Sequence, residues 1–183
     1  MNAIPKKISL KSCLQRSFPL FVSAVLFAGC QHTYTPTSRI PMEPIPEFTA
    51  SGSIELNNGQ PSERKVVFMK NMGTSFATSL RACTAAAIKT TKRELEKRGM
   101  SVTKGAPKSL TLSVNSVDTQ VGAVKIETQL VLEVTAGNGY SSQYVARNNS
   151  VMMANVSRQV DGAIMRGVKA MLEDPKIVDY LVK

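Results

Sequence analysis

Two segments that alternate apolar and polar residues decide the fold: LTLSV at 110–114 and KIETQLVLEV at 125–134. Successive side chains of a strand point to opposite faces, so each segment has one apolar and one polar face. This pattern is typical of an antiparallel sheet that is covered on one side and open to water on the other. Gly137-Asn138-Gly139 then predicts a turn into a third strand from Tyr140 to Arg147.

A helix is predicted from Phe76 to Arg98, ahead of these strands. Thr74 or Ser75 can cap its start, and Gly99 can end it in the left-handed conformation that glycine adopts most easily. Apolar residues recur at three- and four-residue spacing along one face of this helix. Cys83 lies on that apolar face, so we expect a buried thiol rather than a reactive one.

A second amphipathic helix is predicted from about Val156 to Leu172. Asp174-Pro175 then begins a short closing helix, with Asp174 as the cap and Pro175 in the first position. Upstream, Ser53–Leu56 and Lys65–Lys70 are strand candidates on either side of the turn dipeptide Asn58-Gly59. Whether these two strands form a tight hairpin stays open.

This order of elements predicts an α+β fold, a two-layer sandwich in which two amphipathic helices pack on one face of a mostly antiparallel four-stranded sheet. Residues 51–183 are enough for one small domain and not for two. The segment 30–50 holds four of the nine prolines and has no apolar periodicity. We expect it to be an extended tether, which at about 3.1 Å per residue could hold the domain roughly 60 Å from its attachment point.

Residues 1–29 have the plan of a signal peptide. Basic residues come first, without any acidic one, and an apolar run from Phe18 to Phe27 follows. That run is about ten residues long, whereas a helix needs roughly twenty to cross the hydrocarbon core of a bilayer. Cleavage of the leader is therefore expected.

The end of the leader, Phe27-Ala28-Gly29-Cys30, resembles the lipobox of bacterial lipoproteins. The resemblance implies that Cys30 becomes the first mature residue and carries a diacylglyceryl group and an N-terminal acyl chain; secretion without a lipid is the alternative. Gln31 stands where an aspartate would retain a lipoprotein in the inner membrane. The resemblance thus implies an outer-membrane protein that is lipid-anchored and faces the periplasm.

The net charge of the chain is modest once the leader is removed. The full chain carries 23 basic and 13 acidic residues, and the leader takes four basic ones, which leaves 19 against 13, or +6. This balance suits anionic lipid head groups and lacks the clustered footprint of a nucleic-acid binder. One basic cluster is a candidate contact for an anionic lipid or lipopolysaccharide, with a solvated helix face as the alternative. Its members are Lys89, Lys92, Arg93, Lys97 and Arg98.

The sequence offers little chemistry for catalysis. His32 is the only histidine and falls in the expected tether, and Cys83 is left without a disulfide partner once Cys13 is removed and Cys30 is acylated. We therefore expect no catalytic residue, no metal site and no cofactor beyond the covalent lipid. Several carboxylates are expected to be exposed and solvated rather than paired for acid–base work. They are Glu55, Glu94, Glu96, Asp118, Glu127, Glu133 and Asp161.

The stretch Leu95-Glu96-Lys97-Arg98-Gly99-Met100-Ser101-Val102, the strands after it, and the closing Asp174-Pro175 and Tyr180-Leu181 resemble the YajG-like family of outer-membrane lipoproteins. The layout is more distantly similar to that of the lipopolysaccharide-assembly lipoprotein LptE. The resemblance covers roughly the last two thirds of the chain, and its motifs are structural rather than catalytic.

These observations lead to three functional hypotheses. The first is a non-enzymatic envelope lipoprotein whose periplasmic domain binds a protein or glycolipid partner. The second is a component of an outer-membrane assembly, lipopolysaccharide-transport or secretion machine. The third is an envelope hydrolase or transferase that uses a carboxylate pair, for which two close carboxylates in a concave site would be needed.

Overall fold

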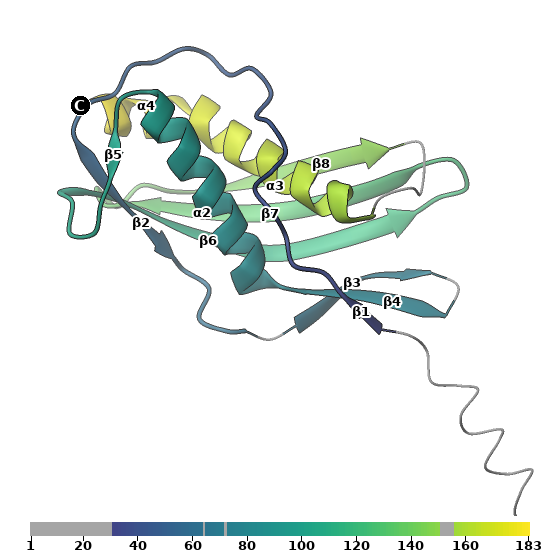
Figure 1. The fold of residues 1–183 in the computed structure, drawn as a ribbon. Coiled ribbons are helices and arrows are strands. Elements are labelled where there is room, and N and C mark those ends of the chain that lie inside the picture. The colour runs from purple at the N-terminus through teal and green to yellow at the C-terminus, as the bar shows by residue number, and fades with distance from the viewer. Residues whose placement is uncertain (1–30, 64, 72, 151–155) are drawn as a thin grey trace, which may run out of the picture. The chain divides into compact units, whose positions relative to one another are not determined.

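The structure, a computed structural model, describes residues 31–63, 65–71, 73–150 and 156–183. The predicted leader and Cys30 lie outside the described residues. Five strands form the larger sheet in the order β5-β2-β6-β7-β8 (Figure 1). Their bounds are β2 (Ser53–Asn58), β5 (Ser101–Val102), β6 (Lys108–Val121), β7 (Ile126–Ala136) and β8 (Ser141–Ser150).

The two segments that alternate apolar and polar residues form the centre of this sheet. Strands β6 and β7 pair antiparallel, with Leu112 opposite Val134 and Val114 opposite Leu132. Opposite residues point to the same face, so the four apolar side chains lie together, and all four are fully buried. Strand β8 also pairs antiparallel with β7, whereas β2 pairs parallel with both β5 and β6.

Helices cover one face of the five-stranded sheet (Figure 1). They are α2 (Leu80–Lys97), α3 (Val156–Glu173) and α4 (Pro175–Val182). Helix α2 packs on β6, and α3 packs on β7 and β8. Ile164 and Val168 of α3 and Leu95 of α2 are almost completely buried in the core between helices and sheet. The other face of the sheet is open to solvent, where Val145 is 57% exposed.

A second, three-stranded sheet has the order β1-β4-β3. Its strands are β1 (Gln31–Thr33), β3 (Lys65–Asn71) and β4 (Thr74–Ser79). Strand β1 runs parallel to β4, and β3 runs antiparallel to it. His32 of β1 stacks on Phe76 of β4, with ring centroids 5.4 Å apart.

The α+β class predicted from the sequence is confirmed, but the single four-stranded sheet is wrong. Residues 74–79 form a strand instead of the first turns of a helix, because Phe76 pairs with Met69 of β3. The helix begins at Leu80, where the side chain of Ser79 accepts a hydrogen bond from the Ala82 N–H at 3.3 Å. The two upstream strand candidates form no hairpin, since β2 and β3 belong to different sheets.

The helix ends predicted from the sequence at Gly99 and Asp174 are confirmed. Gly99 has a φ of +93°, the left-handed conformation expected just after a helix. Asp174 caps α4 and accepts a hydrogen bond from the Lys176 N–H at 2.9 Å, with Pro175 in the first position. Its carboxylate also accepts hydrogen bonds from the hydroxyls of Tyr140 and Tyr144, at 2.8 and 2.7 Å, which ties α4 to the sheet.

Residues 34–50, called the strap below, depart from the free tether predicted for this segment. The strap runs across the outer side of α2 and α3 (Figure 1). Arg93 donates hydrogen bonds to the carbonyls of Ser38 and Ile40, at 2.6 and 3.2 Å. Glu43 pairs with Arg166 and Lys169 of α3, at 3.2 and 3.1 Å. These contacts make the strap part of the same compact unit as the rest of residues 31–183.

Candidate functional site

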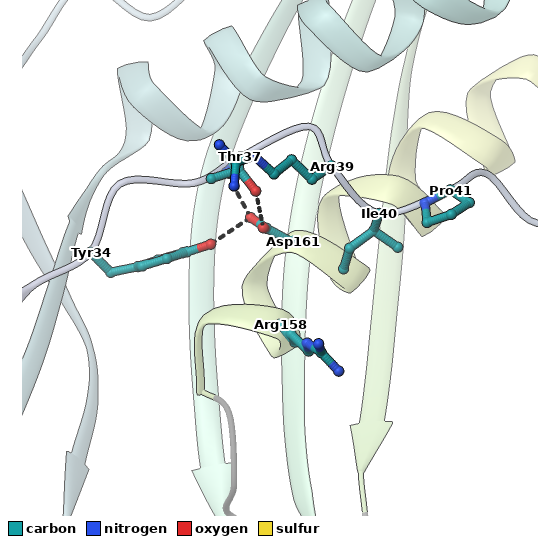
Figure 2. A pocket seen from close by; sticks show the side chains of 7 residues that line it. All are labelled: Tyr34, Thr37, Arg39, Ile40, Pro41, Arg158 and Asp161. Atoms are coloured by element: carbon teal, nitrogen blue, oxygen red, sulfur yellow. Dashed lines mark hydrogen bonds between the residues drawn. The ribbon is translucent and has the colours of Figure 1, made fainter.

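The strap is fastened to α3 by a buried carboxylate. The hydroxyl of Tyr34 and the backbone N–H of Thr37 donate to Asp161 Oδ1, at 2.7 and 2.9 Å. The Thr37 hydroxyl donates to Asp161 Oδ2 at 2.6 Å (Figure 2). Asp161 is 7% exposed, so both oxygens are satisfied by the strap rather than by water. Burial and the hydrogen bond to Asp161 raise the pKa of Tyr34 well above its usual value, which keeps the hydroxyl a donor at neutral pH.

A pocket of about 590 Å³, called the strap pocket below, lies between the strap and the first turns of α3. Figure 2 shows Arg39 and Arg158 on either side of Asp161, with Ile40 and Pro41 at one end. The lining residues are Tyr34, Thr37, Arg39, Ile40, Pro41, Arg158 and Asp161. The pocket thus combines two cations, a hydrogen-bonded floor and a short apolar wall.

The two arginines of the strap pocket are exposed. Within the described chain, neither has an ion-pair or hydrogen-bond partner. Their charges exceed the single negative charge of Asp161, so the pocket is cationic. A guanidinium offers a planar fork of donors that matches carboxylate and phosphate oxygens. The geometry therefore suits an anionic group.

A second opening, of about 340 Å³, lies on the other side of the strap, against α2. It is lined by Pro36, Ser38 and Arg39 from the strap and by Ala82, Ala85 and Lys89 from the helix, among others. Arg39 borders both openings, and Lys89 adds a third cation that no described residue pairs with. The positive charge thus continues across the strap.

The structure divides the basic cluster that the sequence predicted. Glu94 accepts hydrogen bonds from Arg93, Lys97 and Arg98, at 3.4, 2.9 and 3.2 Å. Arg98 also lies 5.0 Å from the ring centroid of Phe48 in the strap. Lys92 pairs with Glu96 at 3.7 Å. Four of the five predicted contact residues therefore have internal partners, and Lys89 is the exception among the described residues.

Two carboxylates expected to be exposed are buried instead. Glu94 and Asp161 are 3% and 7% exposed. The expectation was wrong because the donors to Asp161 come from the strap and the donors to Glu94 come from the end of α2. The spacing of apolar residues gives no information about such hydrogen bonds. The same reason explains why Tyr34, Arg39 and Arg158 were missed as site residues. Arg39 lies between Pro36 and Pro41, whereas Arg158 lies in the predicted second helix, and no sequence pattern links the two.

The described residues bring together little else of chemical interest. No three His, Cys, Asp or Glu side chains in this part of the chain are placed to hold a metal ion. Burial raises the pKa of the Cys83 thiol to about 11, so it stays protonated at neutral pH. None of the described helices has the length and apolar character needed to span a bilayer.

Comparisons with known proteins give a limited result. No family model matches the chain, and no curated protein matches it. Among solved structures it is similar to the crystal structure of protein XCC0632 from Xanthomonas campestris, family model DUF330. The TM-score is 0.45 at 12% identity, over 82% of this chain and 94% of that chain. The resemblance to YajG-like lipoproteins and to LptE stays a prediction.

Proposed function

We propose that the chain is a non-enzymatic envelope lipoprotein, anchored by lipid on Cys30 in the outer membrane, whose periplasmic domain binds the phosphate of an anionic lipid or glycolipid in the strap pocket. The observation that supports the proposed ligand is that two arginines without a partner among the described residues, Arg39 and Arg158, both line one pocket. The leader and the lipobox-like Phe27-Ala28-Gly29-Cys30 support the anchor.

The lining of the strap pocket favours a phosphate that is attached to a larger molecule. Two guanidinium groups can hold phosphate oxygens in bidentate geometry. Ile40 and Pro41 offer an apolar wall beside them, which a free inorganic ion would leave unused. The head group of an acidic phospholipid and the phosphorylated sugar of a glycolipid both fit this description.

The non-enzymatic part of the proposal draws support from the two buried carboxylates. Asp161 has both oxygens occupied by donors from the strap, and Glu94 is surrounded by basic side chains. A general acid or base must exchange protons with a substrate, for which one oxygen has to be accessible. Each carboxylate has a structural partner set instead.

Binding of short-chain phosphatidylglycerol tests the proposed ligand site. Calorimetric titration of the purified protein is expected to show binding that weakens at least about tenfold in the Arg39→Ala, Arg158→Ala double variant, since a charge-assisted hydrogen bond contributes about 1.5–3 kcal/mol. Short-chain phosphatidylcholine and inorganic phosphate are expected to bind more weakly than phosphatidylglycerol.

The control is the Lys104→Ala, Arg147→Ala double variant, which also removes two positive charges, but from exposed positions away from the strap pocket. It is expected to bind like the wild type. An equal loss of affinity in both double variants would show that binding depends on net charge alone, which would contradict a specific site. Unchanged affinity after loss of Arg39 and Arg158 would also contradict it.

A further inference from the structure

The three-stranded sheet exposes a basic face. Opposite residues of paired strands point to the same side, and the register places Thr33 and Val67 opposite Ala77, Lys65 opposite Ser79, and Gln31 and Lys70 opposite Ser75. A hydrogen bond of 3.1 Å from Lys65 Nζ to Thr33 Oγ1 joins two of these side chains across the sheet. We call the exposed members of this set the outer face: Gln31, Thr33, Lys65, Val67 and Lys70.

The outer face has the composition of a surface that meets anionic head groups. Val67 is an exposed apolar residue, 45% accessible, and Lys65 and Lys70 lie on either side of it along β3. The strands β1, β3 and β4 contain no acidic residue. Each lysine near an anionic leaflet contributes roughly 1 kcal/mol of attraction.

No linker residue separates the predicted anchor, Cys30, from the first strand of this sheet. Gln31 follows Cys30 directly and is already paired with β4, opposite Ser75. One extended residue spans at most about 3.6 Å. The head-group layer on each side of a bilayer is about 5–8 Å thick, so an acyl chain on Cys30 brings β1 to that layer.

The strap does not act as a flexible linker between the anchor and the domain, because its own contacts hold it on the helices. Tyr34 directly follows β1, and its N–H donates to the Ala77 carbonyl at 2.8 Å before its hydroxyl reaches Asp161. Arg93 and the Glu43 pairs hold the rest of the strap. The domain is thus held close to its anchor and is not carried some 60 Å away from it, as an extended tether would allow.

We propose that the outer face of the three-stranded sheet docks on the anionic surface of the bilayer that holds the lipid on Cys30, and so fixes the orientation of the domain. This inference rests on the lipid anchor of the proposed function. Docking also places the strap pocket next to the membrane, because Tyr34, one of its lining residues, follows β1 directly.

The test uses the mature acylated protein in vesicles of phosphatidylglycerol and phosphatidylcholine that carry a nitroxide on some head groups. A bimane label is attached to Val67→Cys or, as the control, to Val145→Cys on the open face of the five-stranded sheet; Cys83 is buried and Cys30 is blocked by its lipid. The label at position 67 is expected to lose most of its fluorescence, whereas the label at position 145 keeps it.

Charge reversal provides a second, independent readout. Lys70→Glu is expected to restore much of the fluorescence at position 67, and Lys104→Glu, a reversal of an exposed lysine in the loop after β5, is expected to leave the quenching unchanged. Mass spectrometry of the same sample records the lipid on Cys30. An unquenched position 67 on an acylated protein would overturn the docking and leave the anchor standing; an unacylated Cys30 would overturn both.

Discussion

Asp161→Ala is expected to lower the free energy of unfolding by about 3 kcal/mol. Three hydrogen bonds to a charged group are lost, each of which contributes about 1.5–3 kcal/mol, and the cost of burying the charge, which the substitution also removes, offsets part of their sum. The three donors come from Tyr34 and Thr37, so the loss releases the first part of the strap from α3. Denaturant titration measures the change in stability.

A released strap has a second signature that global stability does not report. In the wild type, two sets of hydrogen bonds hold the peptide bonds around Arg39. Arg93 donates to the carbonyls of Ser38 and Ile40, and Asp161 accepts from the backbone N–H of Thr37. Trypsin is expected to cleave after Arg39 faster in Asp161→Ala. Asp118→Ala, an exposed carboxylate on β6, is the control for both measurements. Equal stability and equal cleavage in the two variants would contradict the conclusion that Asp161 holds the strap on α3.

Glu94→Gln is expected to cost about 2–3 kcal/mol of stability. Breaking a fully buried ion pair costs about 3–5 kcal/mol, and the value here is lower because Lys97 is exposed and the amide of glutamine keeps one acceptor. The Glu94 side chain is 4% exposed, and its carboxylate pairs with Arg93, Lys97 and Arg98. Glu96→Gln, two residues along the same helix, removes only the exposed pair with Lys92 and is expected to cost less than about 0.5 kcal/mol.

The cost of Glu94→Gln should depend on pH. Burial raises the pKa of Glu94, but hydrogen bonds from Lys97 and Arg98 outweigh burial and hold the pKa below its usual 4.5. Such a group stabilises the folded state above the pKa of the unfolded chain, and this contribution is lost as the pH falls through the folded value. The difference between wild type and Glu94→Gln is therefore largest near neutral pH and shrinks below about 4.5. A difference that stays constant with pH would contradict the assignment.

The elements that could be predicted from the sequence are those set by local patterns. The alternation at 110–114 and 125–134 depends on strand geometry alone, and both segments form strands. Asp174 and Gly99 act through hydrogen bonds or backbone conformation within a few residues. Local signals of this kind need no knowledge of distant partners.

The parts that could not be predicted depend on distant partners. Phe76 has helical spacing with Leu80, yet it pairs with Met69 in a sheet, and only the presence of β3 decides between the two. Tyr34 and Asp161 are 127 residues apart, and Arg93 and Ser38 are 55 apart. Proline content favoured an extended tether for residues 30–50, but it carries no information about what such a segment packs against.

The proposal that the chain is an anchored lipoprotein is tested most directly by mass spectrometry of the mature N-terminus, from wild-type protein and from Cys30→Ala expressed in a bacterium with two membranes. We predict a wild-type N-terminal peptide that begins at Cys30 and carries a diacylglyceryl group and an N-acyl chain, and a Cys30→Ala product that carries neither. A wild-type product that begins at Met1, or a mature N-terminus without lipid, would contradict the account.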